Sequence, residues 1–170
     1  GKGCHIGKSR TGVKVATLNL SGRVFMNGAI DDPFTIGRKL AEELRKETPV
    51  ILVDMHAETT SEKAAMGFFM DGLASVVVGT HTHVPTCDHR ILPKGTAYCT
   101  DIGMTGPYDS VIGVEKDIII KRFVDGLPAK FETAKGDPRV AAVVVAIDED
   151  TGRASSIDRM FLTETEVLSL

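Results

Sequence analysis

Apolar and polar positions along the first half of the chain follow helical spacing in two places. Apolar residues recur every three or four positions between residues 34 and 44, directly after Asp32-Pro33, a pair suited to capping and beginning a helix. Thr59 and Glu62 have the spacing of a capping box, which predicts a second helix that runs to about Met70. Two amphipathic helices are therefore expected in this half.

Continuous apolar runs flank the second predicted helix. Residues 50–54 and 74–79 lack alternation, which is typical of strands buried on both faces of a parallel sheet. Strand, helix and strand in this order form a parallel βαβ unit. Residues 13–20 predict a further strand, whereas residues 1–12, rich in glycine and basic side chains, predict a loose terminus or turn.

The second half of the chain has a different pattern. Residues 91–99 predict two short extended pieces joined at a Pro-Lys-Gly turn, and a glycine-rich loop follows at 100–109. Residues 114–123 are ambiguous because their isoleucines are β-branched, and helix is favoured. The remaining predicted strands are 127–133, 140–147 and 153–162, the last two joined by a hairpin turn at 148–152. The expected fold class is α/β, with mixed sheets and a C-terminal antiparallel meander.

Composition limits the functional classes. The 170 residues suit a single domain, 1–170, with 42% hydrophobic residues and a net charge of −3, which argues against a broad nucleic-acid surface. No apolar run approaches the length of a membrane span, so no membrane partner is expected. The three cysteines lack the spacing of a disulfide framework, which favours reduced thiols in a cytoplasmic protein.

Histidines follow two neighbouring strands of the predicted sheet. His56 ends one strand, and His81 and His83 follow the next. Ligands of open α/β sheets bind at the carboxyl ends of the strands, and residues two apart in an extended chain point to the same side. Neutral imidazole binds zinc, iron and manganese. The pattern predicts metal ligands, and three alone would suit a catalytic zinc with an open position.

Several nearby residues allow two interpretations. Asp54 is either a ligand, a partner that holds a ligand in place, or a loop cap, and Glu58 is expected to be solvated. Asp101 either orients a ligand histidine or caps a turn. Gly103 and Gly106 either line a phosphate pocket with backbone amides or only permit a tight turn.

Four segments carry a resemblance to a known family. They are Asp54–Lys63, Gly79–Val84, Ile91–Tyr98 and Thr100–Tyr108. They resemble successive motifs of the YmdB-like group of calcineurin-type metallophosphoesterases, described as 2′,3′-cyclic-nucleotide phosphodiesterases. The similarity runs from about Val13 to Leu162, and the last two motifs are specific to this group.

The resemblance implies an αββα sandwich with two divalent metal ions (iron, manganese or zinc) at the strand ends. Carried over by position, His56 and His81 would bind one ion and His83 the other. It also implies hydrolysis of phosphodiesters such as 2′,3′-cyclic nucleotides, RNA-derived ones included, by a hydroxide that the two metals activate.

The chain departs from the family at its N-terminal side. The family's N-terminal aspartate, glutamate and asparagine ligands and its Gly-Asn-His motif, the source of the acid histidine, have no match, because Asn19 and Asn27 stand in other contexts. The catalytic acid is therefore unassigned. We expect the chain to be the C-terminal portion of the domain, with weak metal binding by itself. A strand edge left open predicts aggregation or pairing with another copy, hence a homo-oligomer.

Two alternatives remain. One is an amidohydrolase, since His-x-His also occurs in metal-dependent β/α barrels, although 170 residues are few for a barrel and the antiparallel C-terminus does not suit one. The other is a catalytically inert remnant that serves as a binding or assembly module. Hydrolysis lost in His81→Ala would favour the enzyme, and a folded but inert chain would favour the remnant.

Overall fold

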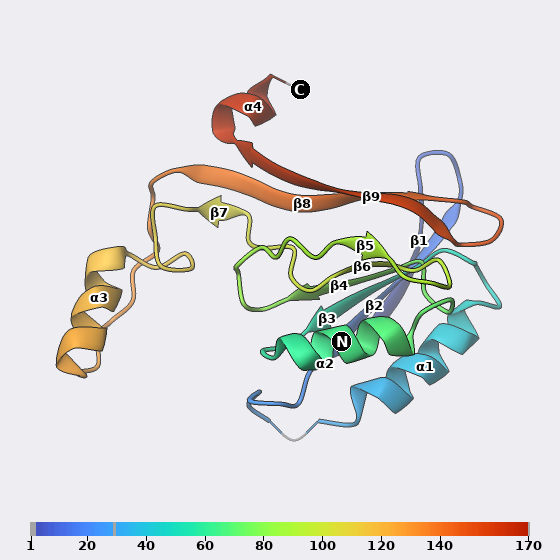
Figure 1. Cartoon of the computed structure of the whole chain (residues 1–170), viewed down its shortest axis with the longest axis horizontal. Helices are drawn as coiled ribbons and strands as arrows, with labels where there is room; N and C mark the ends of the chain where they lie inside the picture. The colour runs from blue at the N-terminus through green and yellow to red at the C-terminus, as the bar shows by residue number, and fades with distance from the viewer. Residues whose placement is uncertain (1–2, 29, 170) are drawn as a thin grey trace.

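The computed structural model describes residues 3–28 and 30–169. Two helices, α1 (Pro33–Leu44) and α2 (Thr60–Phe69), cover one face of a six-stranded sheet. A three-stranded sheet lies over its other face (Figure 1). The layers are therefore helix, sheet and sheet, which confirms the mixed α/β class.

The larger sheet contains the predicted parallel unit at its centre. Its strand order is β1-β2-β3-β4-β6-β5, with β2, β3, β4 and β6 parallel and both edge strands antiparallel to their neighbours. The strands are β1 (Cys4–Lys8), β2 (Lys14–Ser21), β3 (Ile51–His56), β4 (Val76–Thr80), β5 (Arg90–Ile91) and β6 (Ala97–Cys99). Each predicted strand before residue 100 is thus present. The edge strand β1 contradicts the loose terminus expected for residues 1–12, of which residues 1 and 2 lie outside the described part.

The two helices begin where their caps predict. The carboxylate of Asp32 accepts hydrogen bonds from the N–H groups of Phe34 and Thr35, and Thr59 accepts one from the N–H of Glu62. The predicted reciprocal bond of a capping box is replaced. The side chain of Glu62 is buried and instead accepts from the N–H groups of Arg23 and Val24. Glu62, the second residue of the predicted capping box, therefore fixes the loop after β2.

Two apolar clusters hold the layers together. The first joins α1 and α2 to the large sheet, and the second lies between the two sheets. Buried members of the first include Leu18, Val53, Met66 and Tyr98. Buried members of the second include Val76, Cys99, Ala154 and Ile157. Strand β4 contributes to both clusters, as expected for a strand covered on both faces.

The second sheet confirms the predicted C-terminal hairpin. Its order is β7-β8-β9, all antiparallel. Its strands are β7 (Gly106–Pro107), β8 (Pro138–Ile147) and β9 (Ala154–Thr163). The two-residue β7 was not predicted, and its proline is tolerated because β7 is an edge strand. Since the described strands form two stacked sheets, a β/α barrel is excluded and the amidohydrolase alternative is wrong.

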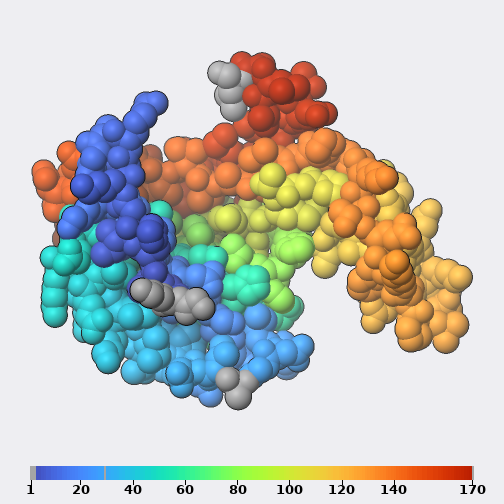
Figure 2. All heavy atoms as spheres, turned by 180° about the vertical axis from the view of Figure 1, so that it is seen from behind, coloured from blue at the N-terminus to red at the C-terminus, as the bar shows by residue number. Residues whose placement is uncertain are grey.

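Helix α3 (Lys116–Asp125) confirms the helical prediction for residues 114–123 and is capped by Gly126, whose φ is 72°. The strand predicted at 127–133 is wrong. Only one isolated bridge, Val114 to Thr133, forms there. Helix α3 and the loops on either side of it form a lobe that stands away from the rest of the molecule (Figure 2). The alternating side chains of residues 127–133 therefore have little surface to pack against. The exposed apolar side chains of this lobe are Ile112, Ile120, Phe123, Val124, Leu127 and Phe131.

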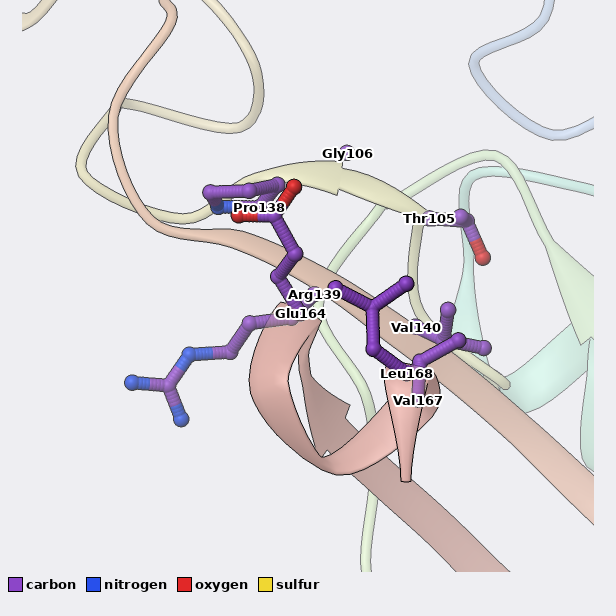
Figure 3. Close-up of a pocket in the computed structure, with 8 residues that line it drawn as sticks. All are labelled: Thr105, Gly106, Pro138, Arg139, Val140, Glu164, Val167 and Leu168. Carbon is purple, nitrogen blue, oxygen red and sulfur yellow. The ribbon is translucent and has the colours of Figure 1, made fainter. Parts of the chain in front are cut away.

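A short C-terminal helix was also missed. Helix α4 (Glu164–Leu168) begins with a complete capping box between Thr163 and Glu166, a spacing readable from the sequence. Together with β7 and β8 it walls an apolar pocket of about 320 Å³ (Figure 3). Among the described residues, the helices are too short and too polar to cross a membrane.

Replacing Gly67 of α2 with alanine should destabilise the protein. In an open helix this change stabilises by roughly 0.5–1 kcal/mol. Here the added Cβ would lie 2.5 Å from Cδ2 of the buried Tyr98 ring. Overpacking costs about 1–3 kcal/mol, so we expect a net loss of about 1 kcal/mol in the free energy of unfolding, measured in urea. A rise instead would show that Tyr98 can move away. Ala65→Gly, at an exposed position of the same helix, measures the propensity effect separately.

Candidate functional site

Polar side chains line the carboxyl ends of three neighbouring parallel strands. Asn19 of β2 lies opposite Asp54 of β3 in the register, and His56 of β3 lies opposite Thr80 of β4. Asp54 and His56 are two residues apart in β3, so both project from the face that is turned away from α1 and α2. The sheet therefore presents a connected polar edge where ligands of such folds bind.

These four residues form one hydrogen-bonded chain. The amide of Asn19 donates to Oδ2 of Asp54 at 2.7 Å, and the hydroxyl of Thr80 donates to Oδ1 at 2.7 Å. Nδ1 of His56 lies 3.0 Å from the Thr80 hydroxyl oxygen. Asp54 thus holds His56 through Thr80, and its role as the partner of a metal ligand stays a prediction. Asn19 and Thr80 were missed, because only the strand register shows that they face Asp54 and His56.

The hydrogen-bonded chain selects one tautomer of His56. The single hydroxyl hydrogen of Thr80 is donated to the Asp54 carboxylate, so the same hydroxyl can only accept from His56. Nδ1 of His56 therefore carries a hydrogen. In the neutral ring, Nε2 is then left with a free lone pair that points away from Thr80. A histidine held in this way is the usual arrangement of a metal ligand.

His81 forms a hydrogen bond with that nitrogen. Its Nδ1 lies 3.1 Å from Nε2 of His56, and the two rings are packed edge to face. Its Nε2 pairs with Glu58 at 3.1 Å, so Glu58 is not simply solvated as expected, although its side chain is 48% exposed. The structure therefore brings two of the three predicted histidines together.

His83 takes a different direction. Its Nδ1 donates to the carbonyl of Ile112 at 2.9 Å, and its Nε2 makes no hydrogen bond to the residues that the structure describes. The expectation that His81 and His83 share one side of an extended strand is wrong, because β4 ends at Thr80 and both histidines have positive φ, 92° and 64°. Residues other than glycine rarely adopt a positive φ, and backbone strain of this kind is common at functional sites.

The pair His56 and His81 suits a metal ion in spacing and donor type. With metal–nitrogen bonds of about 2.1 Å, two nitrogens on one ion lie roughly 3.0–3.4 Å apart for right-angle to tetrahedral geometry. The observed separation of 3.1 Å falls in that range. Within residues 3–28 and 30–169, however, no group of three or more histidine, cysteine or acidic residues is arranged to hold an ion. The metal-ligand role of the three histidines therefore stays a prediction.

A buried ion pair lies beneath the histidine turn. Nζ of Lys63, from α2, lies 2.8 Å from Oδ2 of Asp101, and their side chains are 1% and 0% exposed. The same carboxylate accepts from the hydroxyl and the N–H of Thr82, the residue between the two histidines. Asp101 therefore positions both histidines through Thr82 rather than by contact with an imidazole. Lys63 was missed because a lysine on an amphipathic helix is ordinarily exposed.

The other oxygen of Asp101 fixes the start of the glycine-rich loop. Oδ1 accepts from the N–H of Gly103 at 2.8 Å, and Gly103 has a φ of 86°. The tight-turn interpretation of Gly103 therefore agrees with the structure. Gly106 belongs to β7 and lines the apolar pocket of Figure 3. A phosphate-binding role for these two glycines stays a prediction.

Gly79, which opens the His-x-His segment, is required by packing. A Cβ at this position would overlap the carbonyl oxygen of Thr100 and approach Cδ of Lys63 to 2.6 Å. The absence of a side chain lets β4 approach the segment that carries Asp101. The glycine of the motif thus makes room for the ion pair that supports the histidines.

Asp88 supports the same segment from the other side. Its carboxylate accepts from the hydroxyls of Thr100 and Thr86, at 2.6 and 2.7 Å, and from the N–H of Thr100. Burial alone would raise the pKa of Asp88, but these hydrogen bonds outweigh it and hold the pKa below its ordinary value. The Thr86 hydroxyl oxygen also accepts from the N–H of Asp101.

Solved structures share this arrangement of layers and strands. A protein from Thermus thermophilus, described as hypothetical, aligns with a TM-score of 0.88 and 42% identity over 96% of this chain and 63% of its own. A structure from Mycoplasma pneumoniae, described as a novel phosphatase, aligns with a TM-score of 0.87 and 34% identity over 96% of this chain and 58% of its own. The chain shares the fold of these two proteins.

Sequence comparison identifies the family. The sequence model of the YmdB-like proteins matches residues 1–160, and the chain belongs to this family. It is 50% identical, over 96% of its length, to a Bacillus subtilis protein named 2′,3′-cyclic-nucleotide 2′-phosphodiesterase. The chain spans 61% of that relative, which is less than two thirds of its length.

Lys63→Met should destabilise the protein strongly. Methionine keeps most of the stem but leaves the Asp101 carboxylate buried without its cation. Removing one partner of a buried pair costs about 3–5 kcal/mol, and we expect that loss in the free energy of unfolding in urea. Lys39→Met, on the exposed face of α1, is the matched control and should stay within about 0.5 kcal/mol of the unmodified chain. Equal effects of the two substitutions would refute the structural role of the pair.

Acid should remove the stabilisation that Asp88 provides. Because the pKa of Asp88 is lower in the folded chain than its ordinary value of 3.8, its contribution is fully present above that value and is lost as the pH falls through the folded pKa. We expect Asp88→Asn to be less stable near neutrality and to lose less stability below about pH 4, followed by urea unfolding across pH. Parallel pH profiles for the two proteins would contradict this.

Proposed function

We propose that the chain forms the histidine-bearing part of a metal-dependent phosphodiesterase. The observation that carries the proposal is the pair of imidazole nitrogens of His56 and His81, 3.1 Å apart at the carboxyl end of the sheet. One of the two rings is oriented by Thr80 and Asp54. The family membership and the name of the Bacillus subtilis relative support the same activity.

In this proposal His56 and His81 hold one divalent ion, and His83 offers its Nε2 to a second. Iron, manganese and zinc all suit imidazole nitrogen. Such a pair of ions, when bound, would neutralise the phosphate and supply a nucleophile near neutral pH. Asp54 keeps His56 in the ligand tautomer, and Asp101 keeps the turn at Thr82 rigid. No residue of this chain is assigned as the acid that protonates the leaving oxygen.

The substrate class we propose is a phosphodiester of the 2′,3′-cyclic-nucleotide type, including nucleotides released from RNA. The support is the activity in the name of the relative that is 50% identical to the chain. We also propose that the chain, 1–170, corresponds to the C-terminal part of a longer catalytic domain. The shares of 61% and 58–63% covered in the relatives support a correspondence to part of a longer protein, and its placement at the C-terminal side rests on the sequence motifs. The three cysteines are all free, which suits a cytoplasmic protein, and the open sheet edge at β1 suits a homo-oligomer.

A specific observation favours a second candidate, an inert binding or assembly module. The described residues bring together two of the predicted ligands, His56 and His81, and contain no group of three or more histidine, cysteine or acidic residues arranged to hold an ion. A catalytic site needs at least three protein ligands in the usual zinc arrangement. A chain that folds without binding metal would retain the outline of the site and not its chemistry.

The deciding experiment measures metal content and hydrolysis on one sample. Elemental analysis gives metal per chain, intact mass confirms the polypeptide, and hydrolysis of 2′,3′-cyclic AMP is followed with added Mn²⁺. Bound metal together with hydrolysis that disappears in His81→Ala supports the enzyme. A folded chain of the expected mass with neither metal nor hydrolysis supports the inert module.

Metal affinity should depend on the two paired histidines. Removing a ligand or the partner that orients it typically lowers metal affinity about 10–100-fold, so we expect at least that loss in His56→Ala and His81→Ala, titrated with Co²⁺ by visible absorption. His5→Ala replaces an exposed histidine on β1 and serves as the control. Equal Co²⁺ affinity in His5→Ala and His56→Ala would show that the ion binds elsewhere.

A further inference from the structure

A second cavity lies at the end of the molecule away from the histidines. It has a volume of about 320 Å³ and opens between the end of α1, the turn from β5 to β6 and the tip of the β8–β9 hairpin. Its wall includes Ala74 and Gly95, which precede β4 and β6, whereas His81 follows the end of β4. In Figure 1 the hairpin tip and the α3 lobe, beside which His83 lies, are at opposite ends of the molecule. The cavity is therefore separate from the candidate metal site.

Three basic side chains from three different elements line this cavity. Arg45 comes from the end of α1, Lys94 from the β5–β6 turn and Arg153 from the hairpin turn just before β9. None of the three forms an ion pair with a carboxylate in the described part of the chain, although other lysines and arginines do. Asp150 is the acidic side chain in the wall. The cavity thus carries an excess of positive charge.

Nearby carboxylates are engaged by the backbone. Asp71 accepts from the N–H groups of Lys94 and Thr96, and Asp148 accepts from the N–H and hydroxyl of Thr151. The hydrogen bonds to Asp148 lower its pKa below the ordinary value, and the hydroxyl of Thr151 is the largest cause. Both acids stabilise the turns that carry the basic residues, and neither reaches across the cavity to pair with them.

Arg45 is already oriented. Its Nη1 donates to the carbonyl of Leu73 at 3.0 Å, and its Nη2 donates to the carbonyl of Thr151 at 3.4 Å. Carbonyl oxygens fix a guanidinium without cancelling its charge, and the remaining N–H groups stay available for an anion. Because less side-chain freedom is lost on binding, this arrangement favours affinity.

Glycines make room for the other two basic side chains. A Cβ on Gly72 would lie 2.9 Å from Cβ of Lys94, and a Cβ on Gly95 would lie 3.1 Å from Cγ of Arg153. The aliphatic stems therefore lie flat over bare backbone, and both glycines have positive φ. Lys94 and Arg153 are both exposed, and this packing places their stems along the wall of the cavity while their charged ends stay in contact with solvent.

The chemistry of the wall selects the ligand. The N–H groups of Gly72, Lys94, Gly95 and Gly152 already donate to protein oxygens, so an anion would be held by side chains. Two guanidinium groups and one ammonium suit a tetrahedral dianion better than a carboxylate, because arginine binds phosphate oxygens in pairs. The volume is near the lower end of ligand cavities, about 300 Å³, which suits a small molecule. We propose that this cavity binds a phosphate dianion, either inorganic phosphate or the phosphate group of a small phosphomonoester.

The test is calorimetric titration of the chain with inorganic phosphate and, separately, with 5′-AMP. Arg153→Met keeps the stem over Gly95 and removes the charge, and we expect it to weaken binding at least tenfold, the loss of a charge-assisted hydrogen bond. Lys94→Met should weaken binding several-fold. Tighter binding of 5′-AMP than of phosphate would identify a phosphomonoester as the ligand, and equal binding would identify phosphate itself.

Lys39→Met is the control, because it removes an exposed lysine from the same helix as Arg45. Equal weakening by Lys39→Met and Arg153→Met would show a diffuse charge effect and overturn the proposal. Binding that survives both Arg153→Met and Lys94→Met but disappears in His56→Ala would place the anion at the histidine edge and also overturn it. The absence of any heat of binding with either ligand would also overturn the proposal. Circular dichroism of each variant confirms the fold, so a loss of binding cannot be mistaken for unfolding.

Discussion

The buried pair of Lys63 and Asp101 is the interaction on which the rest of the histidine edge depends. A charge without a partner inside a protein is costly, so each member requires the other to be present and correctly placed. Lys63 comes from α2 on one face of the sheet, and Asp101 follows β6 at the strand ends. Their contact passes beside Gly79 and joins the helical layer to the turn at Thr82. The positions of the histidines are thus a consequence of how α2 packs.

Much of the fold could be predicted from periodicity and caps. The strands of the βαβ unit and the final hairpin were readable because each is covered on a defined face, and that burial requires apolar residues at defined positions. The segment at 127–133 failed for the opposite reason, since its alternating residues pack on little and remain exposed. β1 was missed because an edge strand that pairs through its backbone needs no apolar pattern.

The candidate site was predictable in its residue types and less so in its geometry. His56 and His81 were found because one ends a strand and the other follows the next, and parallel strands end at one edge. The sequence did not reveal the roles of Asn19, Thr80 and Lys63, because each acts through a contact that depends on strand register or on burial. The positive φ of His81 and His83 had no sequence signal beyond the neighbouring glycine, and it sends the two rings in different directions.

Different constraints act on the glycine that precedes the His-x-His segment and on the two histidines. Gly79 is required by the carbonyl of Thr100 and the stem of Lys63, which a side chain at this position would overlap. A descendant of this fold that had lost both histidines would still have to keep the glycine to close its sheet. The glycine and the histidines of the motif can therefore change independently during evolution, and only the histidines bear on the chemistry of the site.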